Sequence, residues 1–578
     1  MLDRIVVFGV QNRLLVLLAL LGTLAGSVFV LPRLNLDAFP DVTNIQVAIN
    51  TEASGLAAEE VEQLITYPIE AVMYAMPAVA EVRSISKTGL SIVTVVFKEG
   101  TDIYFARQLV LERLQVAKEK IPAGIGVPEM GPNTSGLGQV FQYMLRTTDP
   151  QRYDAMSLRS LNDWVVKLLL MPVAGVTDVL SFGGEVRQFQ VNLDPQRLLS
   201  YAVTTEAVVS AIEANNRNAG GWYMDRGPEQ LVIRGVGWIR GGEDGLRDIS
   251  QIPLKTVDGT TVRVGDLGAV EFGGEIRQGA VTTTVRDGQG RPQALGEVVA
   301  GVVLKRVGAN TKATIDGIRA RLPLIQRALP KEVQLEAIYD QADLIDHAIE
   351  TVTTALLEAF VLIVVVLLLF LLNLRAALLV LISVPVSIGL ALMGMAYWGV
   401  SANLMSLGGL AIAIGMMVDG SVVMMENIFK HLSEPDADRA RHVAERIPAD
   451  DTDPHDVARD RTGIALRIQE AAREVGRPVF FAVLIIVVVF TPLFTLEGVE
   501  GKLFQPMAIS IVLAMLASLA VALLVVPALA SYVFRRGVKH RVSFVLVPIE
   551  RAYKTLLTAA LQARWWVVRW FYFSARWH

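Results

Sequence analysis

The stretch that decides the fold is Asn403–Asn427, NLMSLGGLAIAIGMMVDGSVVMMEN, an apolar segment with an acid near its centre and another toward its end. Its length and composition predict a membrane-spanning helix. The two acids, Asp419 and Glu426, are seven positions apart. Because each helical residue turns by about 100°, such a spacing returns nearly to the same direction, and both carboxylates should lie on one stripe.

Asp419 is the residue in this stretch that most needs an explanation. A charge in the hydrocarbon core costs at least ~2.5 kcal/mol, so this carboxylate should face protein or a water-filled path. We therefore predict that Asp419 carries a proton or another ion; the alternative is a structural acid capped by a neighbouring helix. Glu426 lies nearer the end of the span, where its side chain can reach water, so a relay role and a structural role are both open.

Composition places the chain in a membrane. It has 578 residues, of which 52% are hydrophobic and 19% charged, a balance that soluble domains rarely have. The net charge of −4 and the lack of basic clusters interleaved with aromatics argue against nucleic-acid binding. With no cysteine, the 17 methionines are the only soft sulfur ligands.

An enzymatic function is not indicated. The six histidines are scattered without metal-ligand spacing, and no glycine-rich phosphate loop follows a strand. We expect no cofactor.

Apolar runs predict six membrane spans. They lie at Leu14–Leu31, Ala355–Leu372, Ala376–Trp398, Leu404–Met425, Pro478–Leu496 and Pro506–Val533. No small-residue cleavage pattern follows the first run, so we expect it to remain as an anchor rather than leave as a signal peptide. A cytoplasmic N-terminus puts Arg375 and the basic residues after Val533 inside, as the positive-inside rule requires. The long polar region after the first span is then periplasmic.

This polar region predicts a split β-α-β arrangement that occurs twice. The first copy has strands at 44–51 and 90–97 and helices at 57–76 and 102–120. The second copy has strands at 140–146, 176–182, 297–305 and 333–339 and helices at 156–171 and 312–329. The Gly-rich residues 185–277 interrupt it and read as an insertion, either a plain loop or a segment that grips a neighbouring protein.

Two further segments complete the expected organisation. The loop after the fourth span, residues 430–477, has balanced charge and an amphipathic helix near Ala465–Glu474, and reads as a solvated linker. After Ser543 an amphipathic stretch predicts a helix on the membrane surface. The final ARWWVVRWFYFSARWH is too charged to cross a membrane and is either an interfacial aromatic anchor or an out-of-frame tail.

Several motifs resemble one known family. They are LDAFPDVTNIQVAINT (36–51), VEQLITYPIE (61–70), FKEGTDIYFARQLVLERL (97–114), GPNTSGLGQV (131–140), LRSLNDW (158–164), SLGGLAIAIGMMVDGSVVMMEN (406–427) and FTLEGVEGKLFQPMA (494–508). Through them the chain resembles the heavy-metal efflux branch of the resistance-nodulation-division (RND) transporters, the CusA/CzcA type. The resemblance extends to about Val568 and corresponds to the N-terminal half of such proteins.

The resemblance implies a fold class and a set of partners. The fold class is an α-helical multi-pass membrane protein, the RND fold with six transmembrane helices present, and a large α+β periplasmic region of ferredoxin-like porter subdomains. Such transporters are homotrimers of the bacterial inner membrane that work with a periplasmic adaptor and an outer-membrane channel, and proton entry drives export. Membrane lipid is the remaining partner, and no nucleic acid is expected.

The resemblance also names the parts of the chain. The expected division is the N-terminal segment and first span (1–32), porter subdomain 1 (33–135), porter subdomain 2 (136–184 and 278–347), a docking subdomain (185–277), spans two to four (348–429), a cytoplasmic loop (430–477), spans five and six (478–536), and an interfacial helix with the start of a seventh span (537–578).

By resemblance Asp419 matches the proton-relay aspartate of the fourth span, and Glu426 is added to the relay as a candidate. Cobalt-zinc-cadmium members usually carry a further aspartate where this chain has Ala413, which makes the chain look closer to the copper/silver type. Three methionines stand where copper/silver members carry candidate relay ligands: Met405, Met417 and Met515. Thioether sulfur prefers Cu(I) and Ag(I), but methionine is also a common packing residue in apolar helices.

The expected function is proton-driven efflux of heavy-metal cations, Cu(I) and Ag(I) before Co, Zn and Cd. In the family the partner lysine of the relay aspartate and the metal site of the porter cleft belong to the second half, so neither is assigned here. The alternatives are a non-transporting membrane scaffold or fragment, and a drug or lipid exporter of the same superfamily.

Overall fold

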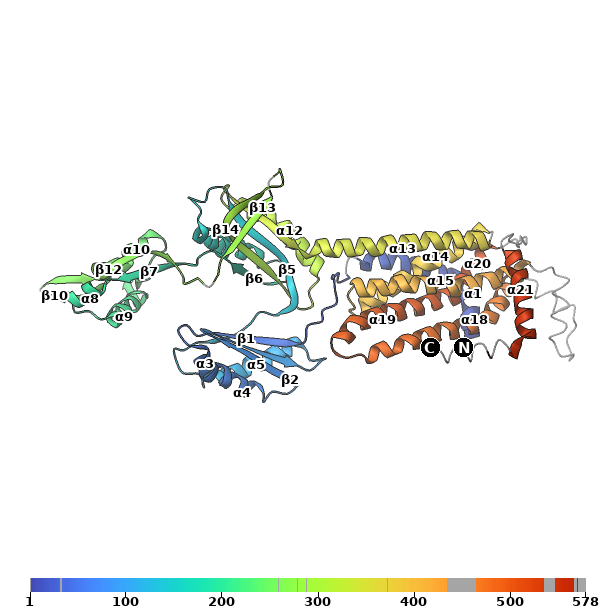
Figure 1. Ribbon diagram of the computed structural model, residues 1–578, viewed down its shortest axis with the longest axis horizontal. Coiled ribbons are helices and arrows are strands. Elements are labelled where there is room, and N and C mark those ends of the chain that lie inside the picture. Colours follow the sequence, from blue (N-terminus) through green and yellow to red (C-terminus); the bar gives the residue numbers. More distant parts are fainter. Residues whose placement is uncertain are drawn as a thin grey trace. The chain divides into compact units, whose positions relative to one another are not determined.

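The structure of the chain is a computed structural model, drawn in Figure 1. It describes residues 2–31, 34–257, 259–277, 279–286, 288–371, 373–433, 464–534, 546–565 and 569. The chain forms two compact units. Unit 1 comprises Met1–Gly138, Lys305–Ile315 and Asp340–His578, and unit 2 comprises Gln139–Leu304 and Asp316–Tyr339.

Among the described residues, six helical segments are long and apolar enough to cross a membrane, which confirms the predicted number. They are α2 (Arg13–Val30), α13 (Gln341–Leu371), α14 (Leu374–Tyr397), α15 (Leu404–Ser433), α18 (Ile464–Phe490, continued by the 3-10 turn η4, Thr491–Thr495), and a last one made of α19 (Gly498–Ala520), the π-turn η5 (Val521–Val525) and α20 (Val526–Val533).

The helices α14, α15 and α19 form the buried centre of this bundle (Figure 1). In α14 56% of the most apolar window is buried, against 11% in each of α2, α13 and α18. The helix α15 packs most extensively against α19. Gly409 makes this approach possible, because a Cβ there would lie 2.8 Å from the Met507 carbonyl oxygen and closer still to the Ser510 hydroxyl.

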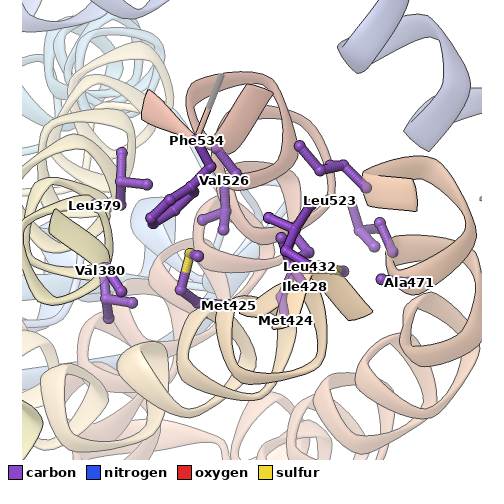
Figure 2. Close-up of a cluster of buried hydrophobic side chains, with 14 of the residues drawn as sticks. Leu379, Val380, Met424, Met425, Ile428, Leu432, Ala471, Leu523, Val526 and Phe534 are labelled. Carbon is purple, nitrogen blue, oxygen red and sulfur yellow. The ribbon is translucent and has the colours of Figure 1, made fainter. Parts of the chain in front are cut away.

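A cluster of apolar side chains closes one end of the bundle (Figure 2). Met424, Met425, Ile428 and Leu432 of α15 lie in it, together with Leu379 and Val380 of α14, Ala471 of α18, Leu523 of η5, Val526 of α20, and Phe534. An N-terminal helix not expected from the sequence, α1 (Leu2–Gln11), adds Val6 and Val10. Its apolar residues are too few to span a membrane, so this helix could not be predicted from the apolar pattern of the sequence.

The expected solvated linker before the fifth span is partly wrong. Residues 464–477 form the first half of α18, and Ile468, Ala471 and Ala472 are fully buried in the cluster of Figure 2. Pro478 lies inside this helix rather than at its start. The rest of the loop, residues 434–463, lies outside the described residues.

The first split unit has the predicted elements and adds two strands. Its order is β1 (Gln46–Glu52), α3 (Ala58–Val61), the π-turn η2 (Glu62–Thr66), α4 (Tyr67–Met73), β2 (Val79–Lys87), β3 (Leu90–Phe97), α5 (Ile103–Lys118) and β4 (Pro128–Met130). The sheet order is β2-β3-β1-β4. The position of β2 was not expected, because most of its side chains are exposed and its sequence lacks apolar alternation.

The second split unit repeats this plan. It contains β5 (Thr134–Thr147), α6 (Ala155–Leu161), the π-turn η3 (Asn162–Val166), α7 (Lys167–Leu170), β6 (Val176–Phe182), β14 (Pro292–Arg306), α12 (Thr311–Ala328) and β15 (Val333–Asp340). Its strands follow the order β6-β14-β5-β15, with β13 (Val281–Arg286) added on β14. This order equals that of the first unit, so the predicted repeat is confirmed.

Both copies also share a π-turn that carries a buried polar side chain. The Thr66 hydroxyl lies 2.8 Å from that of Ser86 and 2.7 Å from that of Ser91. In the second copy Asn162 accepts a hydrogen bond from the Tyr143 hydroxyl at 2.8 Å and donates one to Ser181 at 2.8 Å. Each π-turn is therefore tied to its sheet by hydrogen bonds.

The insertion at 185–277 is a folded module rather than a loop. It contains β7 (Arg187–Leu193), α8 (Pro195–Ser200), α9 (Thr205–Asn215), β8 (Ala219–Arg226), β9 (Glu229–Gly235), α10 (Glu243–Ser250), β10 (Pro253–Val257), β11 (Thr260–Arg263), α11 (Val264–Leu267) and β12 (Gly268–Gly274). Val208, Ile249 and Leu267 belong to its own small core. The β8–β9 hairpin and the segment after it expose Trp222 and Trp238.

Past the last span, the helix α21 (Leu546–Gln562) lies where an interfacial helix was predicted, and nearly all its described side chains are exposed. Most of the aromatic-rich end, residues 566–568 and 570–578, lies outside the described residues.

Candidate proton site and methionine cluster

The helix that carries the site begins with a well-formed cap. The Asn403 side-chain oxygen accepts hydrogen bonds from the backbone N–H groups of Met405 and Ser406, both at 3.0 Å. The Ser406 hydroxyl in turn accepts the Asn403 N–H at 2.9 Å. Asn403 and Ser406 are fully buried. This reciprocal cap satisfies donors that the first turn of a helix leaves free and fixes where α15 starts.

Asp419 and Glu426 lie on one exposed stripe of α15. Ile412, Gly415 and Val423 belong to the same stripe, and Ile412 is 54% exposed. A Cβ at Gly415 would meet nothing within 4 Å. Among the residues that the structure describes, neither acid has a hydrogen-bond or ion-pair partner.

An open stripe of this kind is chemically unusual in a membrane span. A carboxylate facing lipid is costly, so the stripe needs water or further protein against it. A carboxylate held there can accept a proton from one side and release it to the other. The opposite side of α15 is different, because Ala413, Ile414, Met417 and Val418 are buried against the neighbouring helices.

The three predicted metal ligands do not all come together. Met417 and Met515 are almost fully buried in one apolar cluster between α15 and α19, whereas Met405 is half-buried and lies outside it. The backbone carbonyl of Met417 accepts a 2.6 Å hydrogen bond from the Ser518 hydroxyl, which ties the two helices at this level. Met395 also belongs to this cluster, and Met416 and Met507 pack against it.

Met395 could not be singled out beforehand, because it occurs in an apolar run where methionine packs as well as leucine. The cluster is separate from the acidic stripe, since Met417 and Asp419 point to different sides of α15.

A polar group near Glu426 was also missed. The Asn427 amide donates to the Ala471 carbonyl at 2.8 Å, and the His431 Nε2 lies 2.9 Å from a Glu474 carboxylate oxygen. Glu474 ends the amphipathic helix expected in the loop, and its packing against α15 could not be predicted from the sequence. These polar side chains join α15 to α18 one turn beyond Glu426.

Carboxylates and histidines do not form a metal site in the part of the chain that the structure describes. Within the described ranges, no group of three or more His, Asp or Glu side chains is placed to hold a metal ion. A cavity of about 320 Å³ lies between α13, α14 and α15, and residues such as Thr353, Phe360 and Pro385 line it. Its lining contains neither methionine nor carboxylate, so it is not suited to a metal cation.

Comparison with known proteins shows the family to which the chain belongs. The sequence profile of the AcrB/AcrD/AcrF family matches residues 5–575, nearly the whole chain. The chain belongs to this family of RND efflux transporters. Its six spans and its helix-and-sheet units are those of the RND fold.

The curated relatives are heavy-metal resistance proteins. The chain is 39% identical over 569 residues to the cobalt-zinc-cadmium resistance protein CzcA of Cupriavidus metallidurans, an alignment that covers 97% of the chain and 50% of the relative. It is 36% identical over 541 residues to the cation efflux system protein CusA of Escherichia coli (strain K12), covering 93% of the chain and 48% of CusA.

A solved structure agrees with this family membership. The crystal structure of a heavy metal efflux pump superposes with a TM-score of 0.74 at 33% sequence identity, covering 92% of the chain and 48% of the pump. The chain thus spans about half the length of the relatives it matches. The identities of 39% to CzcA and 36% to CusA do not favour the copper/silver type, so that expectation stays a prediction that depends on individual residues.

Proposed function

We propose that this chain is part of a proton-driven exporter of heavy-metal cations, in which Asp419 carries the proton. The observation that carries the proposal is the exposed acidic stripe of α15, in a chain similar to heavy-metal efflux proteins. Such a carboxylate, placed in the middle of a span, has the chemistry of a proton carrier. Glu426 and the polar side chains beyond it would continue the proton route.

The cargo is proposed from the sulfur chemistry. Met417 and Met515 lie in one cluster, and thioether ligands favour Cu(I) and Ag(I) over divalent zinc or cobalt. The lack of an acid at Ala413, which is fully buried beside them, points the same way. Met405, half-buried in the first turn of the helix, would extend the relay toward its start.

The setting is proposed from the family. The transporter would lie in the inner membrane of a bacterium, as a homotrimer with the split units and the inserted module in the periplasm. A periplasmic adaptor and an outer-membrane channel would complete the export route. The exposed β8–β9 hairpin of the inserted module is a suitable docking surface, because its two strands have no covering element among the described residues.

Graded metal tolerance tests cargo and mechanism together. A complete transporter that contains this chain is expressed in a metal-sensitive host and challenged with copper, silver, zinc, cobalt and cadmium salts. We expect tolerance to rise at least about tenfold for copper and silver, and Asp419→Asn to abolish the gain while the membrane-inserted amount stays the same. Tolerance to zinc and cobalt alone would contradict the proposed cargo, and tolerance retained in Asp419→Asn would contradict the proton role.

A membrane scaffold is the second candidate, and the observation that favours it is that Asp419 has no partner among the described residues. The same host tests it with the 578-residue chain alone. Metal tolerance from this chain without further protein would exclude the scaffold function.

A further inference from the structure

Residues 34–44 join α2 to β1, and we call them the strap. They contain LDAFPDVTN, the first nine residues of the motif at 36–51, to which the proposed function assigns no role. The strap has little regular structure, yet Leu34 and Ala38 are 3% and 2% exposed. Hydrogen bonds and ion pairs hold this buried connection at three places.

The first attachment is to the start of α15. The Asp37 N–H donates to the Ala402 carbonyl at 3.3 Å, and the Ala402 N–H donates to the Asn35 carbonyl at 2.8 Å. Leu404, the first residue of α15, donates its N–H to the Ala38 carbonyl at 3.2 Å. The strap is therefore bonded by its backbone to the end of the helix that carries Asp419.

The second attachment is to the turn where β14 ends and α12 begins. The Lys305 ammonium lies 3.2 Å from the Asp37 carboxylate and donates to the Ala309 carbonyl at 3.0 Å. The Thr311 hydroxyl donates to the same carboxylate. The Lys305 side chain is 10% exposed and that of Asp37 21%. Removing either charge of such a pair leaves the other one poorly solvated, so the pair holds firmly.

The third attachment is to the start of α19. The Lys502 ammonium donates to the Thr43 carbonyl at 3.1 Å and to the Asn44 side-chain oxygen at 3.0 Å. It also lies 3.6 Å from the Glu99 carboxylate. Two lysines from distant parts of the sequence thus hold the two ends of the strap.

We propose that the strap passes movement of α15 and α19 to β14 and α12, with Asp37 and Lys305 as positioning residues for coupled transport. This inference rests on the proposed proton-driven function. From Leu404 to Asp419 the helix spans about 22 Å at 1.5 Å per residue, a rigid length that transmits a shift at one end to the other. The α15–α19 pair is close-packed at Gly409, so the two helices move the strap together.

The test measures proton and metal movement in the same vesicles. A complete transporter that contains this chain is reconstituted, and Ag⁺ and Zn²⁺ are each supplied as cargo under a pH gradient. In Asp37→Asn and in Lys305→Met we expect metal flux to fall at least tenfold while a proton flux that depends on Asp419 persists. The protons moved per metal ion then rise, which a loss of folded protein alone would not cause.

Two variants sharpen this test. The charge exchange Asp37→Lys with Lys305→Asp should restore part of the metal flux. Asp41→Asn is the matched control, because Asp41 lies in the strap but among the described residues its carboxylate accepts only the nearby Thr43 N–H, at 3.0 Å. Its protons per metal ion should equal the wild-type ratio. Asp37→Asn could also keep the wild-type metal flux and the wild-type number of protons per metal ion, while Asp419→Asn loses transport. That result would overturn the role of the strap but not the proposed function.

Other results of the vesicle assay have defined meanings. Equal loss of proton and metal flux in Asp37→Asn would reduce Asp37 to a structural residue and overturn the inference. Transport retained in Asp419→Asn would overturn the proposed function and the inference with it.

A cross-link examines whether the strap moves as one body with α15. Leu36 and Ala402 form a bridge like that of two parallel strands, a spacing compatible with a disulfide. The chain has no cysteine of its own, so Leu36→Cys with Ala402→Cys introduces its only thiol pair. We expect equal transport before and after oxidation. Transport that stops on oxidation and returns with reductant would show that the two segments must separate, and would contradict a rigid strap.

Discussion

At the scale of single residues, the surroundings of each carboxylate or sulfur atom decide what chemistry it can do. Asp419 is exposed on a stripe of α15, while Met417 and Met515 are buried between α15 and α19. A carboxylate without a partner and two sulfurs in an apolar cluster have different chemistry. The first can exchange protons with water, and the others can bind a soft cation or only fill space.

Replacing the sulfurs by leucine separates the two roles of methionine. Met417→Leu and Met515→Leu nearly conserve volume, so each should cost less than about 1.5 kcal/mol of stability. If the sulfurs pass metal, silver tolerance in a complete transporter should fall severalfold. Met424→Leu is the control, because Met424 is buried on the same helix in the cluster of Figure 2. Equal tolerance in all three variants would leave Met417 and Met515 as packing residues.

Both acids of the α15 stripe could be found from the sequence because an acid in an apolar run is conspicuous and helical spacing fixes its direction. Met395 and Met507 could not, since a methionine among leucines gives no signal until the fold brings helices together. The His431–Glu474 contact was hidden for the same reason. Its two residues are separated along the chain by the loop that follows α15.

At the scale of elements, the α15–α19 contact depends on a single hydrogen atom in place of a side chain. Gly409→Ala pushes a methyl group against Ser510 and the Met507 backbone, and overpacking of this kind costs about 1–3 kcal/mol. The neighbouring Gly408→Ala is the control, because a Cβ there meets nothing within 4 Å.

Thermal unfolding of the 578-residue chain in detergent measures the difference between these two variants. Gly409→Ala should unfold at a lower temperature than the unmodified chain. Gly408→Ala should unfold at the same temperature or a higher one, because alanine is favoured over glycine within a helix by about 1 kcal/mol. Equal effects of the two substitutions would show that the close approach at Gly409 is unimportant.

The start of α6 in unit 2 gives a pH-dependent prediction. Hydrogen bonds from Ser157, from its side chain first and then its backbone, hold the pKa of Asp154 below its usual value, and Arg187 contributes less. A lowered pKa in the folded state stabilises the helix above the unfolded pKa of about 3.9 and ceases to do so as the pH falls through the folded pKa. Asp154→Ala should therefore cost about 1 kcal/mol at pH 7 and almost nothing at low pH.

Hydrogen exchange at the Ser157 amide reports this effect. The uncharged Thr204, whose side chain caps α9 by accepting the Ala207 N–H at 3.2 Å, is the control. Thr204→Ala should raise exchange at α9 equally at pH 7 and at low pH. Exchange at α6 that Asp154→Ala raises by the same factor at pH 7 and below the folded pKa of Asp154 would contradict this prediction.

Most elements were predictable from the sequence, and the exceptions share a cause. Apolar periodicity revealed the spans and the strands β1 and β3, because each buries a whole face. The strand β2 is largely exposed, and α1 is short with only Val6, Gly9 and Val10 buried, so neither gives a strong pattern. The amphipathic helix expected near Ala465–Glu474 is present, but it is the buried beginning of α18 rather than part of a solvated linker, because α1 and α15 cover its apolar side.

At the scale of the whole molecule, duplication explains the organisation of the polar region. The sheet orders β2-β3-β1-β4 and β6-β14-β5-β15 are the same, and each copy carries a π-turn tied to its sheet. Such turns are often kept at functional sites. The strap enters the first copy at β1, and its Asp37–Lys305 pair holds the end of β14 in the second.

In the proposed function Asp419 gains and loses a proton in each transport cycle. Infrared difference spectroscopy of a complete transporter that contains this chain, recorded during metal transport under a pH gradient, measures this directly. We predict a protonated-carboxyl band that changes during turnover and is absent in Asp419→Asn but present in Glu500→Gln, a control outside the stripe. Metal transport without any change in the ionisation of Asp419 would contradict its role as the proton carrier.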